Sequence, residues 1–356
     1  MSSTGEVYRP GIGHVGDNAA DRVVPPDRMG RRPPVDAAPS AGRLVAQAAD
    51  LPEPSTPLAL PGHVRSPRTV PREFGSGPQV ERVWLMAASL RPPCPLVCVS
   101  SADGGVGRST LVAALGGLLA LACPEPVVAV DMTGRAWGGL VHRVGRRHES
   151  SVWDAAGTID QVASRATIER VAQVGPTGLH ALVGEMEMTS LRRPPSADEA
   201  ARLARRLRTL YPLALLDLPA ADVQATWVAL RAVVPVLVAR ATTDSLQHTL
   251  RLLAQLRAVG LTAVADRSVL VVMATSPHAS WEMRAVQRQA ATAGNVVPVP
   301  YDPGLADPAP IDVRRLRRVT RTALLDVAAA VLTRCPARSA PRPRWRCGPA
   351  RWLAAW

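Results

Sequence analysis

Short apolar runs recur through the middle of the chain, and most of them are continuous rather than alternating with polar residues. They are rich in Val, Leu and Ala, and polar residues, Pro or Gly separate them. Such runs suit parallel strands that are covered on both faces, because both rows of side chains must then be apolar. We therefore predict seven strands, at residues 95–101, 127–131, 179–183, 213–218, 233–239, 268–274 and 296–299.

Amphipathic segments lie between these runs, and several have recognisable ends. Ser196 and Glu199 form a capping-box pattern, and a second segment opens at Asp244 and runs to Gly260 as its stop signal. Strands that alternate with helices predict a doubly wound α/β fold, with a mostly parallel sheet and helices on both faces. Right-handed crossovers then place the loops that follow the strands along one edge of the sheet, where ligands bind.

The two ends of the chain differ in composition from this middle part. Residues 1–80 hold 13 of the 34 prolines, with 9 Arg against 8 Asp and Glu, and they show no period long enough to build a core. This predicts a disordered extension. Residues 313–356 carry 11 Arg and one acid, which is +10 of the net charge of +13. We therefore expect an extension (1–80), an α/β domain (81–334) and a basic Arg/Trp tail (335–356).

The overall composition supports a folded domain and excludes one class of chemistry. Hydrophobic residues make up 47% of the 356 residues and charged residues 20%, which is enough apolar surface for a buried core. All 42 basic residues are Arg, so reactions that need a Lys amine are excluded. Five scattered cysteines and a polar, proline-broken start predict a reduced, cytoplasmic protein. The longest apolar run, 111–123, is too short to cross a bilayer.

One loop carries the clearest chemical signal. Residues 100–110 read Ser-Ser-Ala-Asp-Gly-Gly-Val-Gly-Arg-Ser-Thr and connect the first predicted strand to a predicted helix at 111–122. Glycines let backbone N–H groups approach phosphate oxygens, the helix N-terminus adds positive charge, and a hydroxyl after the basic residue can ligate Mg²⁺. The pattern predicts a phosphate loop with binding residues Gly104, Gly105, Val106, Gly107, Arg108, Ser109 and Thr110.

The loop resembles the deviant Walker A motif of MinD/ParA-type ATPases, which belong to the SIMIBI class of P-loop proteins and carry Lys-Gly-Gly-x-Gly-Lys-Thr/Ser. The resemblance covers residues 82–333. Segment 128–131 resembles the second strand of the family with its acidic end, and segment 211–219 resembles the Walker B strand. The chain is most similar to actinobacterial MinD-like proteins with a proline-rich N-terminal extension, some of them associated with type VII secretion.

This resemblance implies ATP and Mg²⁺ as ligands. Ser109 would ligate Mg²⁺, Thr110 would touch a phosphate, and Asp217 would hold Mg²⁺ through water, with Asp131 as a weaker candidate beside them. These residues match the family pattern in type and in position. The resemblance therefore predicts a magnesium nucleotide site at the ends of three strands.

Several positions depart from the family pattern. Asp103 stands in place of the signature lysine, and Arg108 in place of the phosphate-loop lysine. Thr133 replaces an acid that positions water, and Ala102 replaces the first loop glycine. The stretch 272–276 lacks the Asn that contacts adenine in the family. Arg108 keeps the positive charge, but its planar fork does not reproduce a compact ammonium group. Asp103 opposes the charge that phosphoryl transfer must stabilise. We therefore predict a degenerate site with weak or absent hydrolysis.

The sequence leaves three functions open. The first is a regulatory or positioning factor that acts through protein partners, such as secretion or positioning machinery, and that can form a homodimer. The second is an active ATPase with a nucleotide-dependent dimer cycle. The third is a protein that binds DNA or an anionic membrane surface through its Arg-rich C-terminus, where Trp345, Trp352 and Trp356 stand among arginines. All three predict a cytoplasmic protein, and the third places it peripherally at the membrane.

Overall fold

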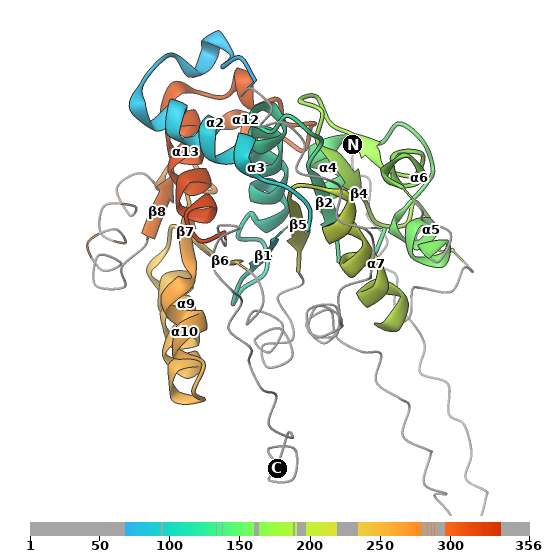
Figure 1. Ribbon diagram of the computed structural model, residues 1–356. Helices are drawn as coiled ribbons and strands as arrows, with labels where there is room; N and C mark the ends of the chain where they lie inside the picture. Colours follow the sequence, from blue (N-terminus) through green and yellow to red (C-terminus); the bar gives the residue numbers. More distant parts are fainter. Residues whose placement is uncertain are drawn as a thin grey trace, which may run out of the picture. The chain divides into compact units, whose positions relative to one another are not determined.

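A computed structural model describes residues 68–335 apart from positions 94, 133, 137, 160–163, 188, 191–196, 219–233, 280–282, 284–285, 287 and 289–295. Its centre is a sheet in the order β3-β4-β2-β5-β1-β6-β7-β8 (Figure 1). The strands are β1 (Leu96–Ser100), β2 (Val128–Asp131), β3 (Gln173–Val174), β4 (His180–Leu182), β5 (Ala214–Asp217), β6 (Val234–Arg240), β7 (Val269–Met273) and β8 (Val296–Val299).

All neighbouring strands pair in parallel except the edge pair, in which β3 runs antiparallel to β4. The prediction of a doubly wound, mostly parallel sheet is confirmed, and each of the seven predicted strands overlaps an observed one; β6 runs one residue beyond its predicted end. The sequence did not predict β3, because two residues are too few to show a period.

Helices cover both faces of the sheet, and alternate residues of each strand point to opposite sides. On β1, Val97 and Val99 belong to the core that α3 and α13 complete, while Leu96 and Cys98 belong to the core on the other face. The first face is covered by α2 (Pro78–Ser89), α3 (Arg108–Ala122), α4 (Leu140–Val144) and α13 (Arg318–Leu332). The second face is covered by α5 (Val152–Gly157), α6 (Arg165–Glu169), α7 (Ala197–Leu210), α9 (Thr243–Ala258) and α10 (Thr262–Arg267).

Helix α3 follows β1 and is the most deeply buried helix of this part of the chain. From its third residue onward every residue except Leu121 is buried. Two glycines in the middle of α3 allow the chain to approach closely. A Cβ at Gly116 would lie 2.9 Å from Leu179, and one at Gly117 would lie 2.9 Å from Thr177 Oγ1. The position of α3, and therefore of the loop before it, is fixed by this packing.

The end of the predicted extension packs on the domain. Residues 68–80 lie within the described part and include the short 3-10 helix η1 (Arg72–Phe74) and the first turn of α2. The ring of Phe74 lies 5.5 Å from that of the buried Trp84, and the guanidinium of Arg321 on α13 lies 5.9 Å from the same Phe74 ring. We assigned residues 68–80 to the extension because their Pro and Gly content obscures the apolar side chains, such as Phe74, that contact the domain. Residues 1–67 and 336–356, which hold the rest of the predicted extension and tail, lie outside the described residues.

Helix ends agree with the sequence in part. The N-cap of α9 is Thr242, whose hydroxyl accepts a hydrogen bond from the Ser245 N–H at 3.4 Å. The sequence placed this start at Asp244, which lies inside the first turn instead. Helix α9 ends at Ala258, and Gly260 follows with a φ of +80°, as a stop signal should. The predicted cap at Ser196 lies outside the described residues.

Three short helical segments complete the described part: η5 (Val313–Arg315) and α12 (Pro303–Ala306) precede α13, and α4 follows β2. Among the described residues, no helix combines the length and apolar character that crossing a membrane requires.

Candidate functional site

The predicted phosphate loop lies between the end of β1 and the start of α3. Gly107 is the N-cap of α3 and has a φ of +94°, and Gly105 has a φ of +67°. A Cβ at Gly107 would also lie 3.0 Å from the sulfur of Met273 on β7. Both positions therefore need glycine, for conformation and, at Gly107, for space. The Ser101 hydroxyl donates to the carbonyl of Asp103 at 2.5 Å and closes the first turn of the loop.

A hollow of about 240 Å³ opens at this loop. Its lining is Gly105, Val106, Gly107, Arg108, Ser109, Thr110, Gly139 and Arg143. Six of the seven predicted binding residues are in this lining, and Gly104 precedes them in the loop. The first turn of α3 contains no acidic residue, so its unpaired N–H groups and the helix dipole favour an anion. The hollow therefore fits phosphate groups.

The predicted magnesium residues lie together beside the hollow. The Ser109 hydroxyl donates to Asp217 Oδ2 at 2.5 Å. Asp217 ends β5 and Asp131 ends β2, and the two are direct partners in the pairing of these neighbouring strands. The carboxyl ends of two parallel strands and the first turn of α3 thus bring together residues that are far apart in sequence.

Burial and charge change the acidity of this pair. The pKa of Asp217 is raised to about 7, chiefly by burial and next by the charge of Asp131, while the Ser109 hydrogen bond and the Arg108 charge act in the opposite direction. A cation beside the two carboxylates would oppose this shift, because a nearby positive charge favours the charged form. The described residues contain no cluster of three or more His, Cys, Asp or Glu side chains. Two carboxylates and a hydroxyl fit Mg²⁺, which keeps several waters and uses few protein ligands next to phosphate.

Two glycines that were not predicted as part of the site pack closely against Asp131 and Ser109. A Cβ at Gly138 would lie 1.9 Å from Asp131 Oδ2, and one at Gly139 would lie 2.9 Å from Ser109 Oγ. The segment after β2 therefore closes over Asp131 and Ser109, and only glycine allows this approach. The Gly-Gly pair itself was the available signal, seven and eight residues beyond Asp131 in the sequence.

The two arginines in the lining of the hollow are held by carbonyl groups. Arg108 donates to the carbonyl of Leu218, directly after Asp217. Arg143 on α4 donates to the carbonyls of Leu305, at 2.9 Å, and Asp307. The guanidinium of Arg108 is thus held next to the residue that follows Asp217.

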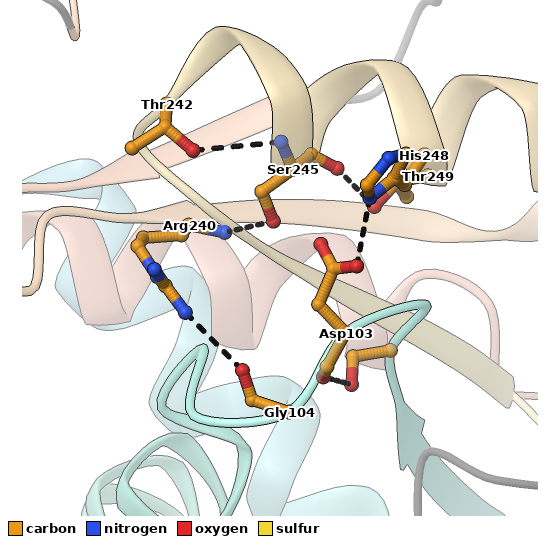
Figure 2. Close-up of polar contacts among 8 residues, drawn as sticks. Asp103, Gly104, Arg240, Thr242, Ser245, His248 and Thr249 are labelled. Atoms are coloured by element: carbon orange, nitrogen blue, oxygen red, sulfur yellow. Dashed lines mark hydrogen bonds and ion pairs between the residues drawn. The ribbon is translucent and has the colours of Figure 1, made fainter.

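On the other side of the loop, two contacts that the sequence did not predict involve Asp103 and Gly104 (Figure 2). His248 Nδ1 on α9 donates to Asp103 Oδ1 at 2.8 Å. Arg240, the last residue of β6, donates to the Gly104 carbonyl at 3.2 Å. Both partners lie more than 130 residues from the loop in sequence, so no local pattern could reveal them.

Three further positions were predicted to differ from the MinD/ParA pattern: Thr133, Ala102 and the stretch 272–276. Thr133 lies outside the described residues. Ala102 is partly buried against the second core, and the stretch 272–276 begins in β7 with Val272 and Met273, both buried. Met273 contributes to the site by its contact with Gly107.

No family model matches the sequence, and no curated protein matches it. Solved structures do resemble the fold. A ParA family ATPase from Chlorobium tepidum TLS is 16% identical over 66% of this chain and 97% of the other, with a TM-score of 0.47. The MinC:MinD cell division protein complex of Aquifex aeolicus is 18% identical over 70% and 99%, with a TM-score of 0.48. The septum site-determining protein MinD of Pyrococcus horikoshii OT3, complexed with Mg-ADP, is 17% identical over 66% and 94%, with a TM-score of 0.46.

Proposed function

We propose that the chain is a MinD/ParA-like nucleotide-binding protein with an atypical phosphate site, which binds ATP with Mg²⁺ and acts through protein partners as a regulatory or positioning factor. One observation carries this proposal. A glycine loop after β1 leads into α3, directly beside a hydroxyl and two buried carboxylates: Ser109, Asp217 and Asp131. An anion site and an oxygen-donor set for Mg²⁺ are therefore adjacent, and a magnesium nucleotide needs both.

Each part of the site has a separate role in this proposal. Backbone N–H groups of the loop and of the first turn of α3, which includes Thr110, bind phosphate oxygens. Ser109 and Asp217 hold Mg²⁺, Asp217 through water, and Asp131 adds negative charge beside them. When bound, Mg²⁺ supplies positive charge that offsets the charge of the phosphates. Gly138 and Gly139 keep the space above the carboxylates narrow.

Hydrolysis is slow or absent in this proposal. Asp103 stands where the family pattern has its signature lysine, and Arg108 is anchored to the carbonyl of Leu218. The loop itself therefore offers less positive charge to a phosphoryl transfer than the family pattern does. The rival function, an ATPase with a nucleotide-dependent dimer cycle, requires rapid phosphate release that a partner stimulates.

Calorimetric titration of the full chain with ATP, in Mg²⁺ and in EDTA, tests the proposal. We expect Mg²⁺-dependent binding that Ser109→Ala weakens by about tenfold to a hundredfold, because the hydroxyl contacts both Mg²⁺ and Asp217. Ser89→Ala is the matched control, since this exposed serine at the end of α2 only hydrogen-bonds the carbonyl of Met86. Lack of binding by the unchanged protein would overturn the proposal. Fast phosphate release in the same samples would favour the rival ATPase.

The finer parts of the proposal concern location and partners. We place the protein in the cytoplasm, with the actinobacterial MinD-like proteins as its nearest branch and with secretion or positioning machinery as its partner. A homodimer that forms with ATP follows from the same resemblance. Light scattering with and without a non-hydrolysable ATP analogue tests the dimer, because the expected mass doubles in the presence of the analogue.

The charge of the C-terminus favours polyanion binding as a second activity. Residues 313–356 hold +10 of the net +13, and the Arg315 side chain, before α13, is 89% exposed. Each basic residue near an anionic surface contributes about 1 kcal/mol at low salt, and five arginines follow Arg334. Sedimentation with anionic liposomes and with DNA, comparing the full chain with one that ends at Arg334, tests this activity. Equal binding by both chains would place the contact on the domain instead of the tail.

A further inference from the structure

Arg240 reaches the start of the phosphate loop from a neighbouring strand. β6 pairs with β1, and Arg240 is its last residue. Its backbone N–H donates to Ser245 Oγ at 3.0 Å, and Thr242 in turn accepts from the Ser245 N–H. The guanidinium donates to the Gly104 carbonyl, and its Nη2 is the nearest atom, at 3.7 Å, to the position that a Cβ on Gly105 would occupy (Figure 2). A rigid backbone thus holds a positive charge against the two loop glycines.

The two arginines that line the hollow donate to carbonyl groups outside the glycine loop. Arg108 donates to the carbonyl of Leu218, and Arg143 donates to the carbonyls of Leu305 and Asp307. A guanidinium has five N–H donors, and the contact with Gly104 uses one side of the Arg240 fork. Its remaining donors face no acidic partner among the described contacts of the loop. Arg240 is therefore the arginine best placed to meet an anion at this end of the loop.

Asp103 is turned toward α9 rather than toward the hollow. Its carboxylate accepts from His248, and the two side chains are 26% and 50% exposed. In Figure 2 the Asp103 side chain points toward α9, while its own backbone continues into Gly104. His248 thereby holds the one acidic side chain of the loop on the outer side. The positive charge of Arg240, in contrast, is in direct contact with the loop through the Gly104 carbonyl.

We propose that Arg240 is an anion-binding residue of this site, which supplies from β6 the positive charge that Asp103 does not supply from within the loop. The ligand is the polyphosphate group of a nucleoside triphosphate, so this inference rests on the proposed function. A guanidinium suits this task because its planar fork matches phosphate oxygens and never loses its charge. An arginine supplied from the same chain stabilises phosphate charge in other nucleotide sites.

Titration of the full chain with inorganic tripolyphosphate and with MgATP tests this role in three variants. We expect Arg240→Ala to weaken both ligands by about tenfold to a hundredfold, the range of a charge-assisted hydrogen bond. Arg240→Lys keeps the charge but loses the planar fork, so it should bind both ligands more weakly than the unchanged protein and more tightly than Arg240→Ala. Arg257→Ala is the matched control, because this exposed arginine on α9 pairs with Asp266 and lies far from the loop in sequence. Equal melting temperatures of the variants show that the fold is intact.

The outcomes separate this inference from the proposed function. If the unchanged protein binds neither ligand, the proposed function fails. If it binds both and Arg240→Ala binds equally well, only the role of Arg240 fails. Equal weakening by Arg240→Ala and Arg240→Lys would also overturn it, because positive charge would then not be what the site requires. If Arg240→Ala melts at a lower temperature, Arg240→Gln replaces it in the test, because glutamine can still donate a hydrogen bond but has no charge. The proposal then requires that Arg240→Gln bind the anions as weakly as Arg240→Ala.

Discussion

On one side of the phosphate loop, Ser109 contacts Asp217, whose strand partner is Asp131, and the two acidic residues are 4% and 1% exposed. On the other side, Asp103 meets His248 with 26% and 50% exposure. We call the first set the acid side and the second set, together with Arg240, the outer side. Strand register fixes the acid side, because two neighbouring strand ends must place their last residues together. Long side chains that contact across the loop create the outer side.

The difference has an electrostatic consequence. Charges interact strongly where they are buried and weakly where water surrounds them. We therefore expect the acid side to affect stability and Mg²⁺ affinity strongly, and the outer side to change the affinity for the anion by smaller amounts. Four measurements on three variants test this comparison.

The largest expected effect is a pH dependence of stability that arises on the acid side. Because burial raises the pKa of Asp217 to about 7, the folded state binds its proton more tightly than the unfolded state does. In EDTA this carboxyl therefore lowers the free energy of unfolding as the pH rises from about 4 to about 7. We expect Asp217→Asn to be more stable than the unchanged protein at pH 8, on the order of a few kcal/mol, and to lose this advantage toward pH 4.

Urea unfolding in EDTA at several pH values measures this difference. Asp266→Asn, which removes an exposed carboxylate that pairs with Arg257, is the control and should leave the pH profile unchanged. Parallel profiles for Asp217→Asn and the unchanged protein would mean that Asp217 is charged throughout, and the acid side would lose its special role.

The next effect concerns Mg²⁺. We expect Asp217→Asn to weaken MgATP binding by about tenfold to a hundredfold and to leave binding in EDTA almost unchanged, because the carboxylate acts through the cation. Titration of ATP with and without Mg²⁺ measures both values. An equal loss in the two conditions would place Asp217 in the support of the loop rather than in the binding of Mg²⁺.

A third test concerns the loop that lies between the two sides. Gly107→Ala introduces a side chain at a φ of +94° and at 3.0 Å from the sulfur of Met273, so we expect a loss of about 1–3 kcal/mol in stability together with weaker ATP binding. Gly260→Ala is the matched control, since Gly260 has a φ of +80° with open space around it. It should lose stability in the same range and bind ATP normally. ATP binding that is normal in both variants would exclude the loop as the phosphate site.

The smallest expected effect lies on the outer side and has the opposite sign. Asp103→Asn removes a negative charge beside the loop, and we expect it to tighten MgATP binding by about threefold, less at high salt, because the site is partly exposed. Asp244→Asn, in the first turn of α9, controls for net charge. Weaker binding by Asp103→Asn would mean that its contact with His248 shapes the loop more than its charge repels the ligand.

Local patterns in the sequence were sufficient to predict every strand except β3 and to identify the residues of the acid side. Continuous apolar runs predicted seven strands, and the loop and the acidic strand ends were visible because each is a short contiguous motif. The outer side escaped prediction because Arg240 and His248 come from elements far along the chain. The packing of residues 68–80 was hidden as well, since Phe74 and Trp84 make contact across a Pro- and Gly-rich stretch. The pattern of apolar and polar residues predicts which face of a helix or strand is buried. It does not predict which side chains of different elements contact each other.

Helix α9 begins directly after Arg240, and its first two turns contact both Arg240 and the phosphate loop. The helix starts within three residues of Arg240, and His248 and Ser245 in its first two turns are tied to Asp103 and Arg240. With 16 residues it is about 24 Å long. Tilting such a lever by about 5° about its first turn displaces its far end by about 2 Å. Val259, a large apolar side chain that is 62% exposed, directly follows that end, so a small tilt of α9 at the loop would produce a larger displacement at an exposed apolar residue.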